Sequence, residues 1–201
     1  FGNPHVAQLA PSNRDFRHYA VGLTEDVMEQ LKPDAVYIEG LGHQRWDAGM
    51  RRKVVKVKLS PLQEFLLGLD FSRGTVSMTR RLGADPDALQ DEIAEFLRDS
   101  IRKPPSGEDL ETGVTEAVVE SLFDGKLKEY LIAREAAASL LFENVAAAVH
   151  RRNSTVVYNG PLNPFETGLD LFRMKRSLDR LVIELPVRRE ELEESLAAIR
   201  A

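Results

Sequence analysis

A short apolar segment that ends in a carboxylate and a glycine constrains this chain most strongly. Residues 35–38 have the composition of a buried strand, which delivers Glu39 and Gly40 to its carboxyl end. An amphipathic helix comes before this segment, and a long polar connection follows it over residues 40–60. Helix, tight turn and buried strand are typical of an α/β unit. Because α/β proteins build their sites where parallel strands end, Glu39 is the first candidate for chemistry.

The helix before this strand is predicted from a cap and an apolar stripe. Ser12 is a suitable N-cap, and Asp15 completes a capping-box pattern three residues later. The apolar residues at helical spacing, which we expect to face inward, are Phe16, Tyr19, Leu23, Val27 and Leu31.

The pattern of helix and short apolar strand recurs along the chain. Strands are predicted at 155–158 and 181–185, with a weaker one at 6–9. Helices are predicted over residues 60–69, 75–82, 85–103, 114–152 with a break near Asp124, 169–178 and 188–201. This order favours parallel strands, adjacent in chain order and joined by right-handed crossovers with helices outside.

We therefore predict a single α/β domain over residues 1–201 in which parallel strands alternate with helices. A complete (β/α)8 TIM barrel needs about 250 residues. The fold is then either part of such a barrel or a small open α/β sheet. A partial barrel leaves open strand edges, so we expect the chain to form a homo-oligomer through an edge or to be unstable alone.

Composition narrows the classes of function. A net charge of -5 in 201 residues argues against a nucleic-acid or anionic-membrane binder. The basic run at residues 51–58 alternates lysine with valine, which fits an exposed strand as well as phosphate binding. There is no cysteine and hence no thiolate nucleophile or thiolate metal site. No apolar run approaches the roughly 18 residues of a membrane span, and no signal segment is recognised. We expect a cytoplasmic protein without a cofactor.

Two stretches together resemble a known family. Asn13, Arg17 and Tyr19 in the first helix, followed by the strand that ends in Glu39, resemble bacterial glycoside hydrolase-like proteins with a TIM barrel, of the family-10-like type. The chain departs from that pattern at Arg14, where the family has proline, and it lacks the cysteines that relatives carry near residue 70. The resemblance implies a barrel fold and a carbohydrate ligand. It places Glu39 at the strand end where such enzymes carry their acid/base residue.

Glycoside hydrolysis requires two carboxylates, one protonated and one ionised. The candidate catalytic pair is Glu39 and Glu184, each at the carboxyl end of a predicted strand. A general acid needs partial burial, and strand alternation puts Glu39 on the same face as Tyr37. Candidate substrate-binding residues, which offer stacking rings or hydrogen-bonding groups, are His43, Trp46, Asp47, Tyr158 and Asn159.

Two other interpretations stay open. The chain is alternatively a non-catalytic carbohydrate-binding or structural remnant of a barrel, since a half barrel cannot complete a two-carboxylate site alone. His43 and Asp47 with Glu39 and His5 could also hold a hard metal, but their spacing is not diagnostic and we predict no metal site.

Overall fold

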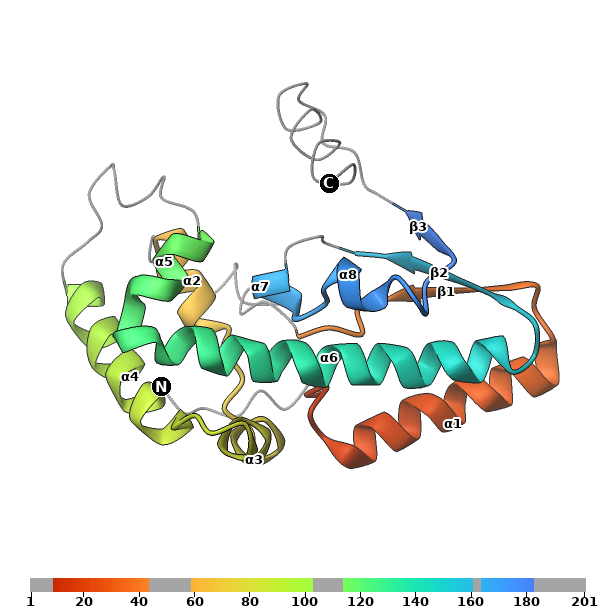
Figure 1. The fold of residues 1–201 in the computed structure, drawn as a ribbon, viewed down its shortest axis with the longest axis horizontal. Coiled ribbons are helices and arrows are strands. Elements are labelled where there is room, and N and C mark those ends of the chain that lie inside the picture. Colours follow the sequence, from red (N-terminus) through yellow and green to blue (C-terminus); the bar gives the residue numbers. More distant parts are fainter. Residues whose placement is uncertain (1–8, 44–58, 103–113, 161–163, 183–201) are drawn as a thin grey trace, which may run out of the picture.

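The structure is a computed structural model that describes residues 9–43, 59–102, 114–160 and 164–182 (Figure 1). Within these ranges the strands are β1 (Ala35–Glu39), β2 (Thr155–Asn159) and β3 (Arg180–Val182). They form one parallel sheet in the order β1-β2-β3. The predicted direction and adjacency of the three strands are therefore confirmed, and the fold is an α/β arrangement.

Helices alternate with these strands. The helices are α1 (Arg14–Leu31), α2 (Pro61–Leu67), α3 (Arg73–Arg81), α4 (Pro86–Arg102), α5 (Glu116–Ser121), α6 (Lys126–His150), α7 (Pro164–Thr167) and α8 (Leu171–Met174). A 3₁₀ turn, Leu122–Gly125, separates α5 from α6, at the break predicted near Asp124. The helix expected over residues 188–201 and the weak strand expected at 6–9, apart from residue 9, lie outside the described residues.

The cap of α1 differs from the prediction by one residue. Asn13, not Ser12, is the N-cap, and its side chain accepts hydrogen bonds from the backbone N–H groups of Asp15 (2.8 Å) and Phe16 (3.0 Å). Ser12 is instead buried, and its hydroxyl bonds Thr75 across the molecule at 2.7 Å. Ser12 is suitable as an N-cap by local rules, but its hydroxyl is bonded to the distant Thr75, and Asn13 is the cap instead.

Helices α2 and α4 each begin at a side-chain cap. Ser60 accepts from the backbone of Gln63, whose side chain accepts from the backbone N–H of Ser60, so a capping box precedes α2. Asp85 accepts from the first backbone N–H groups of α4, ahead of Pro86.

The buried face of α1 is also different from the predicted stripe. Phe16, Ala20 and Met28 contribute to the core. Tyr19, Leu23 and Leu31 are 63%, 50% and 73% exposed, so they belong to a neighbouring strip of the helix that no described element covers. A four-residue repeat alone does not distinguish two adjacent apolar strips on one helix.

The interior consists of two apolar clusters that share α6 (Figure 1). We call the first the sheet core, whose buried members are Met28, Ile38, Ala138, Leu141, Phe142, Val145, Ala146, Val149, Val156, Tyr158, Leu169 and Met174. We call the second the helical core, whose buried members are Leu66, Leu89, Ile93, Leu97, Val119, Leu127, Tyr130 and Leu131. The first part of α6 therefore lies in the helical core and its second part in the sheet core.

The sheet presents one face to the helices and the other away from them. Val36 and Ile38 of β1 pack in the sheet core, while Tyr37 and Glu39 are exposed. This is the alternation predicted for β1, with Glu39 directed away from the helices.

Candidate functional site at the carboxyl edge of the sheet

Glu39 and Asn159 are the last residues of β1 and β2 and lie opposite each other in the register of the sheet. Residues paired in a parallel register point to the same face, so both side chains lie on the face away from α6. Glu39 is exposed, whereas Asn159 is 9% exposed. The expectation that Glu39 is partly buried is therefore wrong.

Tyr158 lies on the opposite face, which is a correction to its predicted role in substrate binding. Its ring is 2% exposed and packs edge-on against Phe142, with ring centroids 5.8 Å apart. Burial raises the pKa of Tyr158 to about 12, so the phenol stays protonated. Tyr158 is a core residue and presents no ring face for stacking on a sugar. Among the described residues of β1 and β2, Tyr37 has its ring on the face away from α6, where it is 53% exposed.

His43 also points inward rather than toward a ligand. It is 4% exposed, and its backbone N–H donates to the Thr167 carbonyl at 2.7 Å. The ring atom Nε2 lies 3.3 Å from the Arg134 carbonyl, which can only accept, so this nitrogen carries the proton. The predicted contact of His43 with substrate is therefore corrected: the side chain joins the loop after β1 to α6.

The second ring nitrogen of His43 lies 3.9 Å from the Asp70 carboxylate. This distance would make an ion pair if the ring were charged. Burial, together with the nearby Arg134 guanidinium, lowers the pKa of His43 well below its ordinary value. The ring is therefore neutral near pH 7, and its contact with Asp70 is not an ion pair.

Glycines allow the loops after β1 and β2 to approach each other closely. A Cβ on Gly42 would lie 2.6 Å from the Thr167 carbonyl oxygen, which is closer than real Cβ atoms come to backbone. Gly168 has a φ of 71°, and a Cβ there would lie 3.0 Å from the Arg134 carbonyl oxygen. The loop that follows Glu39 is thus in direct backbone contact with the end of α7, the helix that follows β2.

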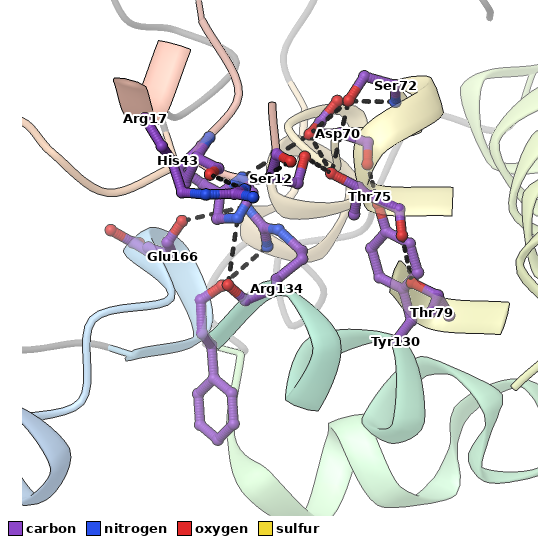
Figure 2. Close-up of polar contacts among 12 residues, drawn as sticks. Ser12, Arg17, His43, Asp70, Ser72, Thr75, Thr79, Tyr130, Arg134 and Glu166 are labelled. Carbon is purple, nitrogen blue, oxygen red and sulfur yellow. Dashed lines mark hydrogen bonds and ion pairs between the residues drawn. The ribbon is translucent and has the colours of Figure 1, made fainter. Parts of the chain in front are cut away.

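Arg134 contacts both segments: its guanidinium binds α7, and its carbonyl lies at the ring of His43 (Figure 2). It lies on α6 between the two cores, is 1% exposed, and donates to the carbonyls of Phe165 (3.2 Å) and Glu166 (3.4 Å). Its Nε atom is buried without a hydrogen-bond partner. Burial lowers the pKa of Arg134, although a guanidinium remains charged at any ordinary pH. A fully buried cation thus lies beneath the carboxyl edge of the sheet.

A hydroxyl and carboxylate network continues from His43 toward α3 (Figure 2). Asp70 accepts from the backbone N–H of Ser72 at 2.8 Å and from the Thr75 hydroxyl at 2.5 Å. Thr75 in turn is bonded to Ser12, and the Tyr130 hydroxyl donates to the Asp70 carbonyl. Gly74 must be small here, because a Cβ would lie 2.8 Å from the Ser12 hydroxyl. The network ties the start of α1 to α3 and α6.

The helical periodicity of the sequence contains a signal for Arg134, which is not among the predicted site residues. The buried positions of α6 include Leu127, Leu131, Ala138 and Leu141, and position 134 belongs to the same three- and four-residue repeat. A charged residue at a core position of a helix indicates a specific buried partner. Its partners are carbonyls of the distant helix α7, which no local pattern identifies.

The remaining predicted site residues, Trp46, Asp47 and Glu184, lie outside the described residues. His5, the fourth member of the metal alternative, also lies outside them. In the part of the chain that the structure describes, no three histidine or carboxylate side chains gather as metal ligands would. No described helix is long and apolar enough to cross a membrane.

The carboxyl edge is thus a two-layered arrangement. An outer layer consists of the exposed Tyr37 and Glu39 with Asn159 beside them. An inner layer consists of His43 and Arg134, which fix the loops that follow the strands. The outer layer offers a carboxylate, an amide and an aromatic ring, which are groups that bind sugars. No family model, curated protein or solved structure matches the chain.

Proposed function

We propose that the chain is part of a TIM barrel of the glycoside hydrolase-like type and acts on a carbohydrate by two-carboxylate chemistry. The parallel order β1-β2-β3, with helices on one face, is compatible with a segment of such a barrel. The observation that carries the proposal is Glu39: it ends β1, lies in register with Asn159, and faces away from the helices. This is the edge at which barrel enzymes build their sites.

In this proposal Glu39 is the general acid and base, and Glu184 is the second carboxylate. Asn159, held beside Glu39 by the sheet register, donates a hydrogen bond to a sugar hydroxyl or to the carboxylate itself. His43 and Arg134 are positioning residues that fix the loops after β1 and β2.

The test compares substrates whose leaving groups do or do not need a proton. Glu39→Gln should slow hydrolysis of an unactivated glycoside about a hundred- to ten-thousand-fold, the usual contribution of general acid catalysis. An aryl glycoside whose phenolate leaves unaided should lose much less in its first step. Glu29→Gln, at an exposed carboxylate of α1, is the matched control and should change neither rate. Equal rates for Glu39→Gln and the parent on the unactivated substrate would reject Glu39 as the acid.

A second function, carbohydrate binding without hydrolysis, is favoured by one observation. Glu39 is exposed rather than partly buried, and Tyr37 on the same face is 53% exposed, as a sugar-stacking ring must be. In that case oligosaccharide titration should detect binding that Tyr37→Ala weakens about tenfold or more, while Tyr19→Ala on α1 leaves it unchanged. Binding that survives in Glu39→Gln, with no hydrolysis by the parent, would select this function over the first.

A further inference from the structure

The first observation concerns the edges of the sheet. In the described sheet, β1 has a strand partner only in β2, and β3 likewise only in β2. The outer edges of β1 and β3 therefore offer backbone donors and acceptors to a further strand. Because all three strands are parallel, a strand added at either edge in the same sense continues the sheet.

The second observation concerns the helix layer beside the β1 edge. Helix α1 packs on α6, and α6 packs on α8, so the helices follow the order of the strands and α1 lies at the β1 end (Figure 1). Along this helix Tyr19, Leu23 and Leu31 are 63%, 50% and 73% exposed. Large apolar side chains four and eight residues apart on one helix form a surface suited to pack against another element.

The third observation concerns the opposite end of the same layer. Phe172 of α8 is 77% exposed and Val182 of β3 is 39% exposed. Exposed cations surround them, at Arg173, Lys175, Arg176 and Arg180. Asp179 is the one exposed carboxylate between residues 171 and 182.

Charge at the α1 end has the opposite sign. Between residues 25 and 34 the exposed carboxylates are Glu25, Asp26, Glu29 and Asp34, and Lys32 is the one exposed cation, so acidic groups are in excess. Glu25 pairs with Arg151, and on the other side Arg173 pairs with Glu135, so each end keeps part of its charge unpaired within the described chain. An acidic, apolar flank at α1 and β1 thus complements a basic, apolar flank at α8 and β3.

We propose that α1 and β1 of one copy of the chain form the docking surface for α8 and β3 of a second copy. The contact is head-to-tail: it continues the parallel sheet and brings the basic flank against the acidic one. A two-fold axis parallel to the strands makes the same contact twice and closes the assembly. A contact between two β1 edges is disfavoured because it brings Glu25, Asp26 and Glu29 of both copies together and forces their strands antiparallel. The proposal does not depend on the proposed function.

The experiment uses one disabling change on each flank of the full chain. Leu23→Asp removes the α1 flank and Phe172→Asp removes the α8 flank; both side chains are exposed, so both variants should keep the wild-type circular dichroism spectrum. Sedimentation velocity should show association of the wild type and about a thirtyfold or greater rise in the dissociation constant for each variant, as for a truncated hot spot. Leu82→Asp, at an exposed leucine after α3, is the control and should associate like the wild type.

Mixing the two variants tests the head-to-tail geometry. Each variant keeps one intact flank, and the intact flanks are complementary, so an equimolar mixture should form a one-to-one complex that neither variant forms alone. A wild type that stays monomeric at every concentration would overturn the proposal. Self-association of Phe172→Asp with wild-type affinity would overturn it as well, because only a contact without α8 permits that result. A mixture that stays monomeric counts against it too.

Discussion

The two ends of α6 are packed in different ways. At its start, Leu127 and Leu131 lie in the helical core, which is formed by α2, α4 and α5 around α6. Toward its end, Phe142 and Val149 lie in the sheet core, which one face of the sheet closes. The helical core joins elements that are close in sequence, whereas the sheet core joins β1 to β2, whose paired residues are 120 positions apart, as in Ala35↔Thr155.

This difference shows what the long segment between β1 and β2, called the excursion below, contributes to the fold. The helical core is built almost entirely from residues of that excursion, and it anchors the first turns of α6. Arg134 and His43 lie at the boundary between the two cores, where α6 passes beneath the carboxyl edge of the sheet. The helical core therefore supports the inner layer of the candidate site without supplying any group to its outer layer.

Truncation of the two cores should have the largest effect. Phe142→Ala in the sheet core should lower the free energy of unfolding by about 3–5 kcal/mol, and Leu127→Ala in the helical core by about 2–5 kcal/mol. Both variants should unfold in one transition in urea, since α6 is continuous through both cores. Leu140→Ala, at a partly exposed position of α6, is the control and should cost about 1 kcal/mol or less.

A second, earlier transition in Leu127→Ala, with the sheet core still folded, would contradict this expectation. It would mean that the two ends of α6 unfold as separate units.

A pair of glycines tests the contact between the loops at the boundary. Gly168 and Gly83 both have a positive φ, 71° and 92°, but only Gly168 is crowded, by Arg134 and His43. Gly83→Ala should cost about 1–2 kcal/mol from backbone strain alone. Gly168→Ala should cost about 1–3 kcal/mol more, because its methyl group must displace packed atoms. Equal losses in thermal or urea unfolding would show that the loops are not held together as described.

The sequence predicted the strands better than it predicted the site. The strands predicted at 35–38, 155–158 and 181–185, the last of which the structure describes as far as residue 182, are short apolar runs bounded by proline, asparagine and glycine, and such runs are local signals. The helix break near Asp124 was found for the same reason, and Phe123 and Asp124 indeed adopt positive φ values. The correct face of Glu39 followed from simple alternation.

The errors arose where distant residues decide the outcome. Ser12 is a good cap by local rules, but Thr75 lies 63 residues away and takes its hydroxyl. Tyr158 was considered for sugar binding, although register with Ile38 places it on the helix-facing side. His43 is predicted to contact substrate, yet its partners are Arg134 of α6 and Thr167 of α7. Tertiary contacts of this kind leave no trace in local periodicity.

Mild acid should lower the free energy of unfolding through His43, which lies at the boundary between the two cores. His43 has a lowered pKa in the folded protein, so the unfolded chain binds a proton first as the pH falls below about 6.5. Stability is then fully present above that pH and declines below it, by at most about 1.4 kcal/mol per pH unit. Between pH 7 and pH 5.5 we expect a loss of about 1 kcal/mol in urea titrations.

His43→Gln should reduce this pH dependence, while His18→Gln, at an exposed position of α1, should not. Identical pH profiles for the wild type and His43→Gln would indicate that His43 is not buried in its neutral form.

The smallest effect is expected at the far end of α6. Asp179 accepts from the backbone N–H of Val156 at 2.7 Å and pairs with His150 at 2.8 Å. The backbone hydrogen bond, followed by that from His150, lowers the pKa of Asp179, so its contribution is present above its ordinary pKa and is lost as the pH falls further. Because the pair is partly exposed, Asp179→Asn should cost less than about 1 kcal/mol at pH 7. A loss of stability above about 1 kcal/mol would mean that Asp179 contributes more to folding than a partly exposed ion pair does.

The location of the ligand site is tested most directly by a backbone amide NMR titration with oligosaccharides. We expect chemical-shift changes at Tyr37, Glu39, Gly40 and Asn159, on the carboxyl edge of the sheet. The opposite edge contains a polar hollow of about 530 Å³, lined by Met28, Glu29, Lys32, Pro33, Asp34, Arg152, Asn153 and Ser154. Changes confined to residues 28–34 and 152–154, with the carboxyl edge unaffected, would contradict the site proposed for this protein.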